Sequence, residues 1–222
     1  TFTVSEPADL VVNTVTIQDA SCNGAANGSI GTDVTGGTPP YTITWLGRTE
    51  ITENLFNLPA GDYTIFVRDA RGCFVTKTIT VSQPQPLLAN ITASTNILCA
   101  AAATGSATVT ATGGTTPYTY QWSSAETTPT ITGTPAGLYS VIVRDAKGCV
   151  ANAQVTLTQP TPLVVQFTNV RHVRCFGAAD GKVDARIFGG VGPYTFTWSS
   201  GPTGTTNSTT SASNLAPGLV TL

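Results

Sequence analysis

The sequence has little charge, one histidine and no methionine: charged residues make up 10% of its 222 residues, and the formal net charge is −2. With no Lys/Arg patch to neutralise phosphates, nucleic acid is excluded as a partner. Apolar runs such as residues 65–67 are too short to cross a bilayer. Since His172 is the only histidine, a catalytic triad or a zinc site would have no imidazole in most of the chain, and we interpret His172 as structural or incidental.

What the sequence does contain is Thr, Val, Ile, Gly and Pro, a mixture of strand formers and turn formers. Alternating apolar residues predict strands at 10–17, 29–35, 41–46, 50–56, 62–69 and 73–82. No segment has a helical period. Short strands at this spacing predict an all-β fold, a small antiparallel β-sandwich of immunoglobulin-like type.

The same motifs return three times with a period of about 77 residues. The first cysteines of the three copies are Cys22, Cys99 and Cys175. Successive ones are 77 and 76 positions apart. A Gly-Gly-x-x-Pro-Tyr turn follows each, with Trp four residues after the Tyr, and the first two copies continue with Pro-Ala-Gly-x-Tyr and Val-Arg-Asp-Ala-x-Gly-Cys. Such a fixed period indicates tandem domains.

The period also predicts the domain boundaries. Residues 1–7 are expected to be the last strand of a preceding repeat, 8–84 repeat 1, 85–160 repeat 2, and 161–222 repeat 3, truncated before its final strands. With no methionine and no leader sequence, we expect an internal fragment. Two prolines spaced by one residue follow each full repeat, and such joins favour an extended, semi-rigid linker.

Each full repeat contains a matched pair of cysteines, about 50 residues apart. We therefore predict the disulfides Cys22–Cys73 and Cys99–Cys149, with Cys175 unpaired because of the truncation. Closing such a loop would stabilise a small domain by roughly 4 kcal/mol. The alternative is free buried thiols in a reducing compartment. Metal binding is disfavoured, because no second Cys or His lies at ligand spacing.

Eight aromatic residues recur at equivalent positions: Tyr41, Trp45, Tyr63, Tyr118, Trp122, Tyr139, Tyr194 and Trp198. Since each Tyr and Trp of the third strand shares a face with an apolar or aromatic residue, we interpret them as core. The alternative is an exposed platform for stacking on sugars.

The acidic residues that precede the second cysteine, Asp69 and Asp145, are predicted to accept hydrogen bonds from turn N–H groups. We expect no cofactor and no catalytic residue. Calcium at the domain joins stays open as an alternative, because oxygen-rich loops bind it in other surface rods.

The run from Cys22 to Ile30, the Gly-Gly-Thr-Pro-Pro-Tyr turn with its Trp, and the Leu-Pro-Ala-Gly-Asp-Tyr segment together resemble the SprB-type repeat. The resemblance covers essentially the whole chain. It implies a part of a very large adhesin of gliding Bacteroidetes, exported by type IX secretion, displayed at the outer membrane as a filament, and used in gliding motility or surface attachment.

Two functions follow as expectations. The repeats are the structural stalk of an extracellular cell-surface adhesin, with neighbouring repeats as partners; or they are themselves multivalent modules that bind carbohydrate or an abiotic surface. No membrane insertion is expected in this segment. With no converging titratable groups, we predict that it is not an enzyme.

Overall fold

The computed structural model describes residues 2–222, and every regular element among them is a strand. The first six strands are β1 (Val11–Gln18), β2 (Gly28–Thr35), β3 (Thr42–Trp45), β4 (Asn54–Leu58), β5 (Gly61–Arg68) and β6 (Phe74–Val81). The next six are β7 (Leu88–Thr95), β8 (Gly105–Thr112), β9 (Thr119–Trp122), β10 (Thr130–Thr134), β11 (Gly137–Arg144) and β12 (Val150–Leu157). The last five are β13 (Val164–Arg171), β14 (Gly181–Phe188), β15 (Tyr194–Thr197), β16 (Thr203–Thr206) and β17 (Thr209–Leu215).

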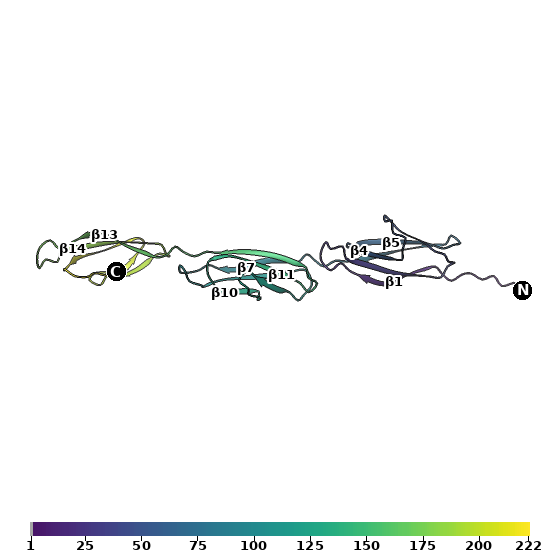
Figure 1. Cartoon of the computed structure of the whole chain (residues 1–222), viewed down its shortest axis with the longest axis horizontal. Coiled ribbons are helices and arrows are strands. Elements are labelled where there is room, and N and C mark those ends of the chain that lie inside the picture. Colours follow the sequence, from purple (N-terminus) through teal and green to yellow (C-terminus); the bar gives the residue numbers. More distant parts are fainter. Residues whose placement is uncertain (1) are drawn as a thin grey trace. The chain divides into compact units, whose positions relative to one another are not determined.

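The first six strands form two three-stranded antiparallel sheets, in the orders β1-β2-β4 and β3-β5-β6 (Figure 1). Named A to G without a D strand, these are the A-B-E and C-F-G sheets of an immunoglobulin-like sandwich. The orders β10-β8-β7 and β12-β11-β9 repeat the arrangement. The prediction of tandem immunoglobulin-like β-sandwiches is therefore confirmed.

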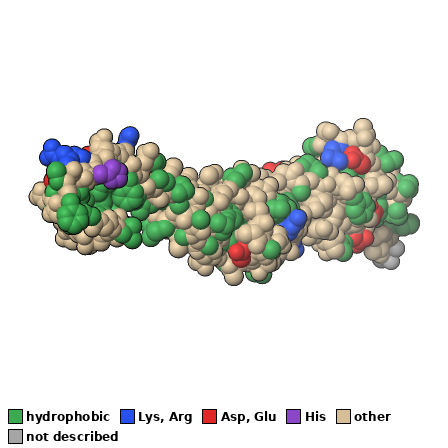
Figure 2. Space-filling model, turned by 60° about the vertical axis from the view of Figure 1, so that its left-hand side comes forward, with side chains coloured by type: hydrophobic (Ala, Val, Ile, Leu, Met, Phe, Trp, Pro, Cys, Tyr) green, Lys and Arg blue, Asp and Glu red, His purple; other side chains and the backbone are tan. Residues whose placement is uncertain are grey.

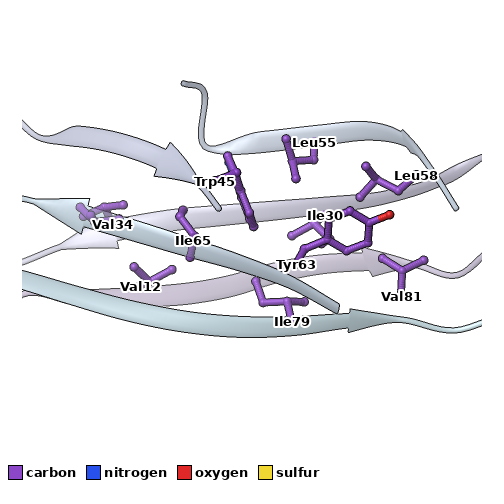
Figure 3. Packing of buried hydrophobic residues seen from close by; sticks show 11 residues of the cluster. Val12, Ile30, Val34, Trp45, Leu55, Leu58, Tyr63, Ile65, Ile79 and Val81 are labelled. Atoms are coloured by element: carbon purple, nitrogen blue, oxygen red, sulfur yellow. The ribbon is translucent and has the colours of Figure 1, made fainter. Parts of the chain in front are cut away.

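Alternation along the strands explains the core of the first sandwich. On β5, Tyr63, Ile65 and Val67 are buried, and the residues between them are less so. Trp45 ends β3 and is 2% exposed, and it points into the layer that contains Ile30 and Leu55 of the facing sheet (Figure 3). Burying one such side chain stabilises the fold by about 2 kcal/mol, so the two sheets are held mainly by this layer.

The fourth strand begins later than the sequence predicts. The expectation was 50–56, whereas β4 spans Asn54–Leu58. Its limits are set by pairing with β2, in which Leu55 lies opposite Ile30 and Leu58 opposite Gly28. Leu55 and Leu58 are both buried, so the register that buries both leucines decides where the strand lies.

The described residues fall into two compact units. One comprises the residues up to Asn90 with Thr110–Thr128 and Val141–Ala153; the other comprises Ile91–Val109, Pro129–Ser140 and Gln154–Leu222. Residues 2–10 form no strand, so the strand expected at 1–7 is not formed by its described residues. The predicted domain boundaries stay a prediction.

The last repeat has a smaller core within the second unit. Its sheets are β13-β14-β17 and the hairpin β15-β16, and residues 216–222 form no strand. Trp198 is buried with Val183 and Ala212, and Val220 packs against them from one side. The Phe167 ring lies 5.9 Å from the Trp198 ring, so an aromatic pair closes part of this core.

Candidate functional site

The loop after β1 presents Cys22 at the end of the repeat where β6 finishes. The backbone N–H of Ala20 donates to Ser82 O at 2.9 Å, and that of Gly24 donates to the side chain of Gln83 at 2.7 Å. Within the loop, the N–H of Ala25 donates to Cys22 O at 3.0 Å. The loop is therefore fixed against the join that leads to the second repeat.

The turn between β11 and β12 presents Cys149, and it is organised by one buried carboxylate. Oδ1 of Asp145 accepts hydrogen bonds from the N–H groups of Lys147 and Cys149, each at 2.9 Å, and Oδ2 accepts one from Thr115 at 2.8 Å. Asp69 does the same before Cys73 in the first repeat. The prediction that these two aspartates cap turn N–H groups is confirmed.

These hydrogen bonds also decide the charge of the two aspartates. Burial opposes the ionised form and by itself raises the pKa of Asp69, but the N–H groups of Thr38, Cys73 and Arg71 stabilise the carboxylate more. The pKa of Asp69 therefore lies below its ordinary value, and the pKa of Asp145 is lowered in the same way.

Cys22 and Cys149 form a disulfide that links the first repeat to the second. The sulfurs are 2.09 Å apart, the Cα atoms are 5.6 Å apart, and the two cysteines are separated by 127 positions in sequence. Sγ of Cys149 also lies 3.4 Å from Ser21 O. The disulfide therefore joins the loop after β1 to the turn between β11 and β12.

The two disulfides predicted from the sequence, Cys22–Cys73 and Cys99–Cys149, are wrong. Cys73, Cys99 and Cys175 are all free and exposed. Cys73 precedes β6, and the Cys22 loop is bonded to the other end of that strand. Eight residues of strand span about 25 Å, whereas a disulfide needs Cα atoms within about 7 Å. β12 separates Cys99 from Cys149 in the same way, because the N–H of Ile97 bonds to Thr158 beyond its far end.

The aromatic residues lie in or beside the cores. Trp45, Trp122 and Trp198 are 2%, 1% and 3% exposed, and each indole N–H donates to an oxygen of a nearby Thr, at 2.9, 2.9 and 3.2 Å. Tyr63 and Tyr139 are buried. The tyrosines at the Gly-Gly turns, Tyr41, Tyr118 and Tyr194, are only half-buried, and each hydroxyl donates to the carbonyl of the first Gly of its turn.

One role was missed by the sequence reasoning. The hydroxyl of Tyr63, at the start of β5, donates to Pro59 O at 2.7 Å, and that of Tyr139 donates to Pro135 O at 2.9 Å. A Tyr at the start of strand F that bonds to the backbone a few residues upstream is the tyrosine corner of immunoglobulin-like folds. The signal was present in the recurring Pro-Ala-Gly-x-Tyr motif. Val220 takes the equivalent position in the last repeat.

Few titratable groups lie close together. His172 is exposed, and within residues 2–222 no three His, Cys, Asp or Glu side chains gather as a metal would require. On the face shown in Figure 2, charged side chains form small separate groups among hydrophobic and uncharged polar atoms. No helix of the described residues is long and apolar enough to cross a membrane.

A groove of about 580 Å³ lies beside β9 and β11. Tyr118, Tyr120, Gln121 and Arg144 line it. In the first repeat the position of Tyr120 is held by Ile43. The groove therefore combines aromatic rings, an amide and a guanidinium in the second repeat.

Three segments of the chain match a known protein family. A family model described as the SprB repeat matches residues 14–49, 91–127 and 168–203. No curated protein matches the chain.

Several solved structures are similar over much of the chain. The eight N-terminal domains of Down Syndrome Cell Adhesion Molecule are 16% identical, with 82% of this chain and 27% of that chain covered and a TM-score of 0.31. Sidekick-1 immunoglobulin domains 1–5 are 12% identical, with 90% and 49% covered and a TM-score of 0.36. Drosophila OTK extracellular domains 3–5 are 14% identical, with 67% and 62% covered and a TM-score of 0.35. The fold of this chain is defined by its strand orders. The threefold family match agrees with the period of the sequence, and the chain is built of SprB-type repeats.

Proposed function

We propose that this chain is a non-enzymatic segment of the stalk of a secreted cell-surface adhesin, acting in gliding motility or surface attachment. The SprB-type repeats support this role, because tandem domains extend a protein by one unit per copy. Type IX secretion, display at the outer membrane and assembly into a filament belong to the same proposal.

The observation that carries the proposal is the Cys22–Cys149 disulfide between repeats. A stalk transmits load from one domain to the next, and a covalent bond across the join bears load that hydrogen bonds alone do not. Disulfides also persist mainly in oxidising compartments, which supports an extracellular location.

The test compares a chain of two repeats with a chain of four, each applied to polysaccharide and to glass. A stalk is expected to bind neither above background, whatever its copy number. A steep rise of avidity from two repeats to four would contradict the stalk and favour adhesive repeats, since multivalency raises avidity by orders of magnitude.

The second candidate function is carbohydrate binding, and it is favoured by the groove at Tyr118 and Tyr120. Aromatic faces and planar polar groups suit stacking on a sugar and hydrogen bonding to its hydroxyls. Because Ile43 occupies the matching position in the first repeat, Tyr120→Ile gives a matched variant with an aliphatic side chain already found at that position. Loss of polysaccharide binding in this variant would support the second function. Equal binding by both proteins would contradict it.

Calcium at the domain joins stays an open alternative to the expectation of no cofactor. At the join described here, both carboxylate oxygens of Asp145 accept backbone hydrogen bonds, so calcium would have to displace them or bind other oxygens. A rise in melting temperature on adding calcium to chelator-treated protein would support calcium binding, and an unchanged temperature would contradict it.

A further inference from the structure

The cysteines of this chain occupy two kinds of position. We call Cys22, Cys99 and Cys175, in the loop after the first strand of each repeat, the loop cysteines. We call Cys73 and Cys149, in the turn before the sixth strand, the turn cysteines. The one disulfide joins a loop cysteine to the turn cysteine of the next repeat.

The free loop cysteines are held as the bonded one is. The N–H three residues after Cys22 donates to its carbonyl at 3.0 Å, and the same bond is 3.1 Å long at both Cys99 and Cys175. Gln83 accepts from the N–H of Gly24, and Gln159 accepts from that of Ala101. All three loops therefore repeat one backbone turn, and the first two are fixed to their joins in the same way.

The free turn cysteine is likewise held as the bonded one is. The N–H of Cys73 donates to Asp69 at 2.9 Å, as that of Cys149 donates to Asp145 at 2.9 Å. The difference is exposure: Cys22 and Cys149 are half-buried, whereas Cys73, Cys99 and Cys175 are exposed. Each exposed thiol thus lies on a loop or turn of the same form as the loop or turn that the Cys22–Cys149 disulfide joins.

We propose that the Cys22–Cys149 bond is one instance of a recurring junction, in which the loop cysteine of one SprB-type repeat bonds to the turn cysteine of the next. In this scheme Cys73 is a free turn cysteine that bonds to the loop cysteine of another repeat. Cys99 and Cys175 are free loop cysteines that bond to the turn cysteine of another repeat. The partner is another SprB-type repeat that presents the complementary half. The proposal concerns only the bond between repeats and does not rest on the adhesin function.

The chemistry needs an oxidant, and a low-molecular-weight disulfide such as oxidised glutathione supplies it. One protein thiolate attacks the glutathione disulfide, forms a mixed disulfide and releases one glutathione thiol. The thiolate of the partner repeat then attacks the protein sulfur of that mixed disulfide and releases the second. Two protein thiols are oxidised, and one glutathione disulfide is reduced to two thiols.

A second copy of this chain provides the test. The variant Cys99→Ser/Cys175→Ser keeps only the turn half, Cys73, and the variant Cys73→Ser keeps only the loop halves. Both retain Cys22 and Cys149. Each is incubated alone and in an equal mixture in glutathione buffer, and dimers are measured by non-reducing electrophoresis and located by mass spectrometry of the linked peptides.

The mixture is expected to form at least about tenfold more dimer than either variant alone, because only a loop and a turn reach disulfide geometry together. The linked peptides should join Cys73 to Cys175, because the repeat that follows Cys99 is already the third repeat of the same chain. Repeating the mixture in urea is the control, since unfolded chains should pair without preference. Equal dimer in all three native samples, no dimer in the mixture, or the same pairing in urea as in buffer would overturn the proposal.

Discussion

The hydroxyl of Tyr63 bonds to the backbone of Pro59, and this bond closes the corner between the two sheets of the first sandwich. Because the ring is buried, its hydroxyl must find a partner inside the protein. The corner therefore couples the fold of the Pro-Ala-Gly turn to the position of β5.

Replacing Tyr63 with Phe should remove this hydrogen bond while keeping the ring. We expect a loss of about 1 kcal/mol in the local free energy of opening of β5. Hydrogen exchange measured on β5 peptides checks this, and β11, with its own corner at Tyr139, serves as the control in the same sample. Unchanged protection of β5 would contradict a stabilising corner.

The carboxylate of Asp69 gives its turn a pH dependence. Since the pKa of Asp69 is lower in the folded chain than its ordinary value of 3.8, the folded state holds the ionised form preferentially. The resulting stabilisation is fully present above pH 4 and is lost as the pH falls through the lowered pKa.

The Cys73 amide, bonded to Asp69, should report this loss. Its NMR shift is expected to stay constant from neutral pH to about pH 4 and to change only in stronger acid. In Asp69→Asn that acid transition should vanish, whereas Asp33→Asn, which alters an exposed carboxylate on β2, should leave it intact. A transition that persists in Asp69→Asn would show that another group controls the turn.

At the scale of the strands, β2 depends on a glycine at its first position. A Cβ on Gly28 would lie 2.6 Å from Cγ1 of Val81 and 3.0 Å from Leu58 O. Gly105 and Gly181 begin β8 and β14 with similarly close neighbours. The strand that follows each loop cysteine therefore starts where the chain has no room for a side chain.

In the variant Gly28→Ala, the added methyl group should push Val81 of β6 and the Leu58 carbonyl of β4 away from β2. We expect the free energy of unfolding to fall by about 1–3 kcal/mol. Chemical denaturation followed by tryptophan fluorescence measures the change. Gly137→Ala is the matched control, because the nearest atom to its Cβ is 3.8 Å away on the side chain of Tyr139. Similar stability losses in both variants would mean that contact at Gly28 is not the cause.

These strands show which structural features could be predicted from the sequence. Alternation predicted the strands and placed Trp45 inward, because burial on one face of a strand is a local property of the sequence. The limits of β4 depended on pairing with β2, which a local pattern does not contain. The cysteine pairing was wrong because the period shows which cysteines are equivalent, but not that β6 holds Cys22 and Cys73 at opposite ends.

At the scale of the whole molecule, the disulfide changes the path of an applied force. Tension on the chain passes from Cys22 directly to Cys149, so the residues between them are not stretched. The bond therefore protects most of two repeats from mechanical extension.

Single-molecule pulling should reveal this protection. Full unfolding of the oxidised chain is expected to end about 440 Å shorter than that of the reduced chain, because 127 residue steps remain enclosed by the bond. Cys22→Ser should behave like the reduced chain, with or without reductant. Equal final lengths for the oxidised protein and Cys22→Ser would contradict the bond.

The same enclosed segment has a consequence for survival among proteases. A single cut of the backbone anywhere between Cys22 and Cys149 leaves both fragments attached through the two sulfurs. A nicked molecule thus stays in one piece until a reductant opens the bond. If the junction recurs along an array, successive enclosed segments overlap, and no single cut within them releases the outer part of the protein.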